Sequence, residues 1–181
     1  MRNPIYNKKH VTEYIIYGLL SSFAYIIVVD YFLYNNKYEN FYYVYLGNLL
    51  FMFGILLYVV RLLNRPYDGK SAGTMMIAGI MATLTGIVLS CILILISMLF
   101  FFPDLFSAVA QNKVIENAPE TIQAKRPGEL LLMLLLNAII ANFGVGAFIS
   151  VVVAYAGKKD QRKDRTESLD LNVPNRKVKA Q

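Results

Sequence analysis

The stretch between Lys70 and Asp104 most constrains how this chain can fold, because it contains no charged side chain. As one helix, residues 71–102 would be about 48 Å long at 1.5 Å per residue. The hydrocarbon core of a bilayer is only ~30 Å thick. We therefore predict a membrane span over residues 74–102 whose ends project, with Phe100, Phe101 and Phe102 at an interface. Pro103 should stop the helix.

Three further uncharged or nearly uncharged runs are each long enough to cross a bilayer, which needs about 20 apolar residues. They cover residues 14–33, 41–63 and 130–156. The chain is 56% hydrophobic, which is typical of a membrane protein. The first run lacks a small-x-small cleavage site, so we interpret it as a retained span rather than a signal peptide. The sequence predicts an all-α integral membrane protein with four transmembrane helices within residues 13–156.

Basic residues are distributed unequally between the two sides of this predicted topology. Fourteen Lys and Arg fall in the N-terminal segment 1–12, between the second and third spans, or after Gly157, whereas four fall in the other two loops. Such an excess marks the cytoplasmic side. We therefore expect both termini in the cytoplasm, an inner (plasma) membrane location, and membrane lipids rather than nucleic acid as partners of the basic charge.

Two segments outside the predicted spans are long enough to carry a role of their own. The outer loop 103–129 has apolar residues near helical spacing, so it is either a docking element or a connector lying on the membrane. Residues 157–181 are polar, lack aromatic side chains and mix both signs of charge. We expect this basic cytoplasmic tail to be disordered.

Catalytic and cofactor motifs are absent from the sequence. Gly69, Lys70 and Ser71 resemble part of a P-loop, but the earlier glycine and the preceding strand are missing. His10 is the only histidine and Cys91 the only cysteine, and Cys91 falls within a span. Zinc sites and activated nucleophiles need more such groups than this. We predict no catalytic residue, no metal, no cofactor and no enzymatic activity.

Small residues recur every four positions on two of the predicted spans. Helices in lipid associate through close backbone approach, for which such faces are suited. We therefore predict that the third and fourth spans pack tightly together. The small residues are Ala78, Ala82, Gly86 and Ser90 on the third span, and Ala138, Gly146, Ser150 and Ala154, with Asn142 between them, on the fourth.

Four polar side chains lie in the proposed outer half of the spans, at Asp30, Asn48, Asn137 and Asn142. In one interpretation the amides bond across helices and hold the bundle together. In the other, the four side chains line an outward-facing polar pocket, because intramembrane polar groups often mark ion or substrate paths. The sequence leaves both interpretations open.

A glycine- and threonine-rich third span, an F-P-D exit, an outer loop and a lysine-rich end characterise the chain from about Arg61 to Asp164. The corresponding sequences are GKSAGTMMIAGIMATLTGIVLSCILILISMLFFFPDLF and NAIIANFGVGAFISVVVAYAGKKDQRKD. In these features the chain resembles small four-span bacterial inner-membrane proteins of unknown function. The resemblance implies a four-helix membrane fold and no activity.

Taken together, these features favour a structural or interaction component of the membrane. We expect it to act as a homo-oligomer or as a subunit beside another membrane protein. The alternative is a small-molecule carrier or channel that uses the outward-facing polar pocket.

Overall fold

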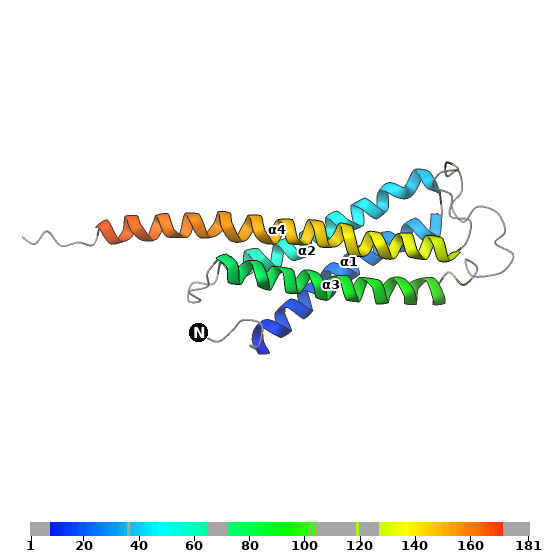
Figure 1. The fold of residues 1–181 in the computed structure, drawn as a ribbon, viewed down its shortest axis with the longest axis horizontal. Helices are drawn as coiled ribbons and strands as arrows, with labels where there is room; N and C mark the ends of the chain where they lie inside the picture. The colour runs from blue at the N-terminus through cyan, green and yellow to red at the C-terminus, as the bar shows by residue number, and fades with distance from the viewer. Residues whose placement is uncertain are drawn as a thin grey trace, which may run out of the picture.

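In a computed structural model, the chain is described over residues 8–35, 37–64, 72–101, 103, 119 and 127–171. Side chains are described for residues 10–35, 37–64, 72–101, 103, 119 and 128–157. The described elements are all helical: α1 (Lys8–Asn35), the short 3-10 helix η2 (Tyr38–Phe41), α2 (Tyr42–Leu63), α3 (Ala72–Phe100) and α4 (Pro127–Leu171). The described part of the chain is an all-α bundle (Figure 1).

Four of these helices are long and apolar enough to cross a membrane, over His10–Asn35, Tyr38–Leu63, Ala72–Phe100 and Gly128–Gly157. This confirms the four predicted spans at the level of a multi-pass membrane protein. The bundle's exterior agrees with lipid as its surroundings, because large apolar side chains on every long helix are exposed. Examples are Ile27 at 66%, Val88 at 59% and Phe148 at 64% exposure.

Local chemistry explains where the helices begin and end. Asn35 closes α1 by donating a side-chain hydrogen bond to the carbonyl of Tyr31 at 3.0 Å. α3 ends at Phe100, with Pro103 close behind it, a residue that cannot continue a helix. α4 starts at Pro127, and proline is favoured in the first helical turn. Glu129 lies in the same turn, where its negative charge interacts favourably with the positive end of the helix dipole.

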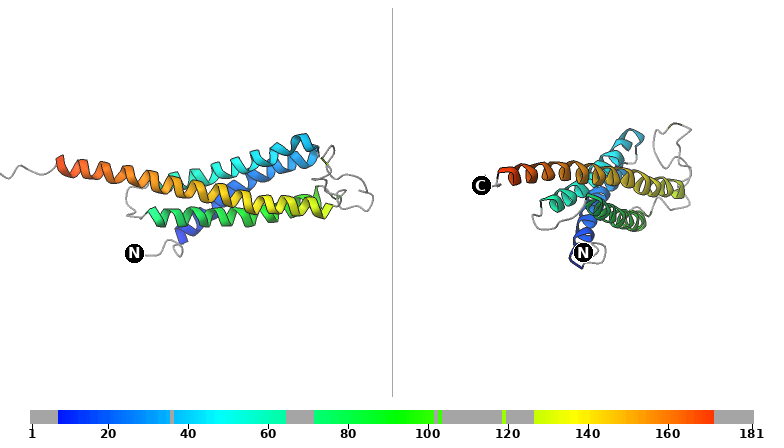
Figure 2. Two further views of the ribbon diagram at one scale, coloured as in Figure 1. Left: turned by 45° about the horizontal axis from the view of Figure 1, so that its top comes forward. Right: turned by 60° about the vertical axis from the view of Figure 1, so that its left-hand side comes forward.

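The four long helices alternate in direction and are not arranged around the bundle in chain order. α1 packs beside α2 and α3, and α4 also packs beside α2 and α3, so α1 and α4 occupy opposite corners. η2 joins α1 to α2 at one end, here called the η2 end, where α3 also finishes and α4 begins (Figure 1). α1 runs obliquely to α3, and the two separate toward the end that holds Lys8 (Figures 1 and 2).

Two helix boundaries differ from the sequence expectation by more than three residues. α1 begins at Lys8, inside the predicted N-terminal segment 1–12. α4 continues through Gly157 to Leu171, where we expected the disordered tail 157–181 to begin. Helix nucleation is the costly step and was already achieved in the span. The Lys, Gln, Arg and Glu residues that come next extend an existing helix readily. Residues 172–181, and the outer loop apart from a few positions, lie outside the described residues.

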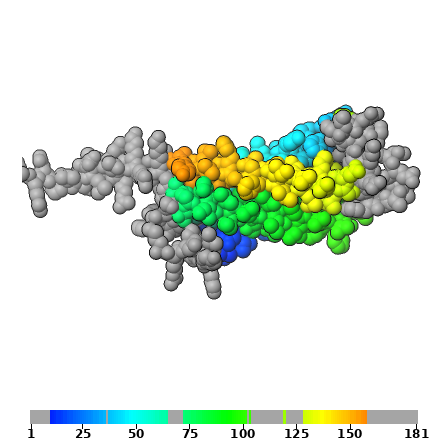
Figure 3. Space-filling view, viewed as in Figure 1, coloured from blue at the N-terminus to red at the C-terminus, as the bar shows by residue number. Residues whose placement is uncertain are grey.

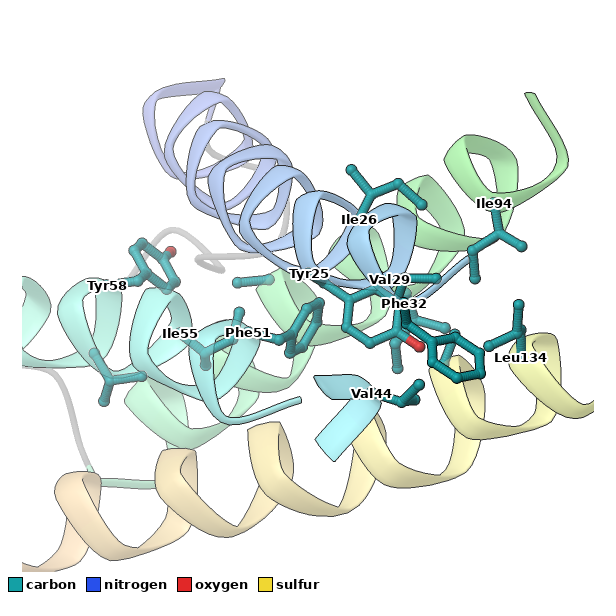
Figure 4. Packing of buried hydrophobic residues seen from close by; sticks show 14 of the residues in the cluster. Tyr25, Ile26, Val29, Phe32, Val44, Phe51, Ile55, Tyr58, Ile94 and Leu134 are labelled. Atoms are coloured by element: carbon teal, nitrogen blue, oxygen red, sulfur yellow. The ribbon is translucent and has the colours of Figure 1, made fainter. Parts of the chain in front are cut away.

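The core lies where the four long helices meet. Tyr25, Phe51, Ile55 and Tyr58 are fully buried there, and Figure 4 shows the ring of Tyr25 between α1 and α4. At the η2 end, aromatic rings pack against one another, including Tyr31 on Tyr43 with centroids 4.8 Å apart and Phe32 on Phe41 at 5.5 Å. Such aromatic clusters are typical of a membrane interface.

Candidate functional site

An amide network links three helices in the half of the bundle nearer η2. Asn48 on α2 and Asn137 on α4 exchange two side-chain hydrogen bonds, with Nδ2 to Oδ1 distances of 3.3 and 3.2 Å. Asn137 Nδ2 also donates to the hydroxyl oxygen of Tyr25 on α1 at 3.0 Å. Tyr25 thus reaches across the bundle to α4, although the backbones of α1 and α4 are on opposite corners. We call Tyr25, Asn48 and Asn137 the amide network.

Gly47 makes room for this network. A Cβ at Gly47 would lie 3.0 Å from Cδ2 of the Tyr25 ring, closer than carbon atoms normally approach. With glycine there, the ring lies directly against the α2 backbone and places its hydroxyl beside Asn137. Asn48 is 5% exposed and Tyr25 is fully buried, so the network supplies partners that lipid cannot offer.

Asp30 forms a separate pair nearer the end of α1. Its carboxylate accepts a hydrogen bond from the hydroxyl of Ser97 on α3, and the Asp30 residue is half-buried. The hydrogen bond described for Asp30 therefore joins it to α3 and not to the three asparagines. The structure brings together Asn48 and Asn137, and places Asp30 with a partner that the sequence analysis did not single out.

Asn142 lies midway along the α4 span and is fully buried. Neither its Nδ2 nor its Oδ1 has a hydrogen-bond partner among the described residues, and the same is true of the buried hydroxyl of Ser90 on α3. Asn142 is five residues beyond Asn137, which rotates it roughly 140° around the helix. It therefore faces a different neighbour and does not join the amide network.

The small residues predicted on the third and fourth spans are buried, but two of those predicted on α3 to face α4 lie against α1 instead. A Cβ at Gly146 of α4 would overlap Thr83 of α3, and a Cβ at Gly79 would overlap the Ser150 side chain. A Cβ at Gly18 of α1 would instead lie 3.0 Å from the Ala82 carbonyl oxygen and 3.0 Å from the Gly86 nitrogen. Gly79 and Thr83 thus meet α4, whereas Ala82 and Gly86 meet α1.

We define the α3–α4 seam by the contacts of Gly79 with Ser150 and of Thr83 with Gly146. We include the buried residues that continue the same helix faces by their spacing, namely Ser90 on α3 and Ala138 and Asn142 on α4. α3 and α4 lie side by side along the face shown in Figure 3. Ala78, Ala138 and Ala154 are also buried. The close approach of these two helices results from side chains no larger than a methyl or hydroxymethyl group over much of the contact.

Most serine and threonine hydroxyls among the described residues donate to a carbonyl of their own helix. Thr83 donates to Gly79 at 2.9 Å, Ser150 to Gly146 at 2.7 Å, and Ser22 to Gly18 at 2.9 Å. This local bond satisfies the hydroxyl without involving another helix. Ser90 and Ser97 are different, because Ser97 bonds to Asp30 and Ser90 has no described partner.

Metal-binding groups are not gathered within the described residues, where no three His, Cys, Asp or Glu side chains lie close enough to hold an ion. Cys91 is half-buried and forms no disulfide. The chemistry that the described site offers is hydrogen bonding by neutral amides and hydroxyls, with one carboxylate at its edge.

Sequence reasoning did not identify Tyr25 or Ser97 as members of the polar set. A signal for each existed. Tyr25 stands inside the first span, away from the tyrosines near its ends, and a buried phenol usually has a hydrogen-bond partner. Ser97 comes seven residues after Ser90, so it falls close to the line of small residues predicted on the third span.

Comparison with protein-family models, with curated proteins and with solved structures gave no match in any of the three.

Proposed function

We propose that this protein is an interaction component of a cell membrane, acting as a subunit or homo-oligomer and not as an enzyme. The observation that carries the proposal is the length of α4. The helix continues from its membrane span at Gly128–Gly157 to Leu171 without interruption. The continuous helix carries the charged segment 158–171 beyond the bundle, where a partner outside the hydrocarbon can reach it.

The extension, residues 158–171, begins where the bundle ends. A Cβ at Gly157 would overlap the side chain of Leu63, the last residue of α2, so Gly157 packs against the end of its neighbour. Beyond that point α4 projects past the other described helices (Figures 1 and 2). Its sequence, KKDQRKDRTESLDL, is rich in charge and suits a partner surface in water or the headgroup zone.

The charge distribution supports a cytoplasmic position for the extension. Fourteen Lys and Arg residues belong to the side that includes both termini, against four on the other, and the positive side of a membrane protein is cytoplasmic. The resemblance to small four-span bacterial inner-membrane proteins supports the inner membrane as the location. Anionic lipid headgroups would attract each basic residue of the extension that lies near the membrane surface by about 1 kcal/mol.

The packing also bears on how copies of this chain could associate. Gly18, Gly79, Gly86 and Gly146 are all occupied by contacts within one chain. A second copy or another membrane protein would therefore bind to other surfaces, which include the exposed apolar sides of the long helices and the extension that projects past them.

Photo-crosslinking in native membranes tests this proposal. A crosslinking amino acid replaces Gln161, Arg165 or Ser168 in turn, with lipid-facing Ile140 and Phe148 as control positions. We expect one discrete adduct from the extension, lost in Gln161→Pro, which breaks the helix, and retained in Gln161→Ala. Recovery of uncrosslinked monomer from all three positions would contradict an interaction role.

A second candidate, a small-molecule carrier or channel, is favoured by the set of polar side chains inside the bundle. Asp30, Asn48, Asn137 and Asn142 all lie within the membrane-crossing segments, where polar groups commonly mark a path for a solute. Flux into proteoliposomes should then be abolished by Asn142→Leu or Asp30→Asn while the purified protein stays monodisperse. Normal flux in both variants would exclude a path along these residues.

A further inference from the structure

The register of α3 against α4 places Ser90 and Asn142 on the same seam. Gly79 meets Ser150 and Thr83 meets Gly146, so each turn forward on α3 matches a turn backward on α4. Ser90 comes seven residues after Thr83 and returns to the same face. Asn142 precedes Gly146 by four residues and likewise stays on its face. Ser90 therefore lies at the level between Ala138 and Asn142.

Both side chains are fully buried at this level, yet their hydrogen-bonding groups have no described partner. An asparagine amide offers two donors and an acceptor oxygen, and a serine hydroxyl offers one donor and an acceptor. Buried polar groups in proteins are almost always paired, with protein atoms or with ordered water. The other hydroxyls of the seam, on Thr83 and Ser150, are already bonded to their own helices.

We propose that Asn142 and Ser90 form a buried water-binding site at the centre of the α3–α4 seam. The ligand must both donate and accept hydrogen bonds, because Asn142 presents both kinds of group. It must also be uncharged. The carboxylate of Asp30 is engaged by Ser97, and the residues that define the seam include no ionisable group.

Size narrows the ligand to water. On one side of the site, α3 and α4 approach so closely that a single methyl group at Gly146 or Gly79 would overlap the opposite helix. Ala138 is fully buried on the other side. A buried water typically makes about three hydrogen bonds to otherwise unpaired groups, and the Nδ2, Oδ1 and Oγ atoms of this pair supply that number. The site does not depend on whether the α4 extension binds a partner.

Matched substitutions measure whether the pair is occupied. Ser90→Ala removes a hydroxyl that the water uses, whereas Ser150→Ala removes a buried hydroxyl that bonds only within α4. We expect the apparent melting temperature in detergent to be about 2–4 °C lower for Ser90→Ala than for Ser150→Ala. Equal stability, or a higher temperature for Ser90→Ala, would overturn the proposal.

Asn142→Leu is a second test, because the expected change in melting temperature has opposite signs with and without a bound water. If the amide is unpaired, a leucine of similar size removes the cost of burying it and stabilises the protein. If the amide holds a water, the substitution expels that water and leaves Ser90 unpaired. We expect a lower melting temperature than that of the unsubstituted chain. An unchanged or higher temperature would overturn the proposal.

A direct measurement on the unsubstituted chain removes any dependence on how the variants fold. In protein labelled with 15N-asparagine, the side-chain amide hydrogens of Asn142 should show a nuclear Overhauser effect to water. Asn137 is the internal control, because its amide donates to Tyr25 and Asn48. A water contact at Asn142 and none at Asn137 supports the site. No contact at Asn142 would overturn it.

Discussion

Asn137 and Asn142 stand five residues apart on one helix, and the bundle treats them differently. Asn137 exchanges hydrogen bonds with Asn48 and Tyr25 on two other helices. Asn142 is more deeply enclosed, in a seam lined by small side chains, and has no described partner. The same chemical group thus joins helices in the amide network and, in the seam, is left to bind the proposed water. The direction in which each asparagine points around the α4 axis decides whether it finds hydrogen-bond partners, because those partners come from the helix that it faces.

The largest effect is expected from breaking the seam itself. Gly146→Leu places a side chain against Thr83 where even a Cβ would overlap, and overpacking at its upper end costs about 3 kcal/mol. Gly144→Leu is the control, because a Cβ at Gly144 meets nothing within 4 Å. We expect Gly146→Leu to lose monodisperse protein at much lower temperature and Gly144→Leu to match the unsubstituted chain. Equal behaviour of the two variants would show that the seam is not closely packed.

An intermediate effect is expected in the amide network. Asn137→Leu leaves Asn48 and Tyr25 without their shared partner, and an unsatisfied buried polar group costs about 1–3 kcal/mol. Removing both amides, in Asn48→Leu with Asn137→Leu, should cost less than the sum of the single changes. A thermal-stability double-mutant cycle measures this coupling. Additive losses would mean that the two asparagines do not bond to each other.

The smallest effect is expected at Asp30. Ser97→Ala removes one hydrogen bond to a carboxylate that is only half-buried. Water or headgroups near the η2 end can replace the hydroxyl, so we expect a loss of about 0.5–1.5 kcal/mol. Asp30→Asn retains an acceptor for Ser97 and should lose less than Ser97→Ala. If Asp30→Asn lost as much stability as Asn137→Leu, the pair of Asp30 and Ser97 would contribute as much to stability as the amide network, which would contradict this ranking.

The sequence was sufficient to predict the spans because charge-free length is a property of the chain alone. The long run after Lys70 and the proline at its end required α3 or something close to it. Small residues at four-residue spacing likewise predicted that α3 approaches α4 closely, and Gly146 and Ser150 of the predicted set lie in that contact. On α3, however, the contact is made by Gly79 and Thr83, which the prediction did not name.

Which helix each polar or small residue faces could not be predicted, because this depends on how four helices are arranged around one another. With α1 and α4 on opposite corners, Ala82 and Gly86 meet α1, and Tyr25 must cross the bundle to reach Asn137. The extension of α4 was missed for another reason. Its composition suits a disordered tail as well as a helix, and only its attachment to a formed span decides between them.

The continuity of α4 has a mechanical consequence. A continuous helix resists twisting and bending, so α4 moves as one rigid element. That element includes Asn137, Asn142 and the extension. A protein that gripped the extension and turned it would rotate Asn137 away from Asn48 and shear the line of contact with α3. The hydrogen bonds between Asn48 and Asn137, together with the site at Asn142 and Ser90, would then determine how much force on the extension is needed to change the packing inside the membrane.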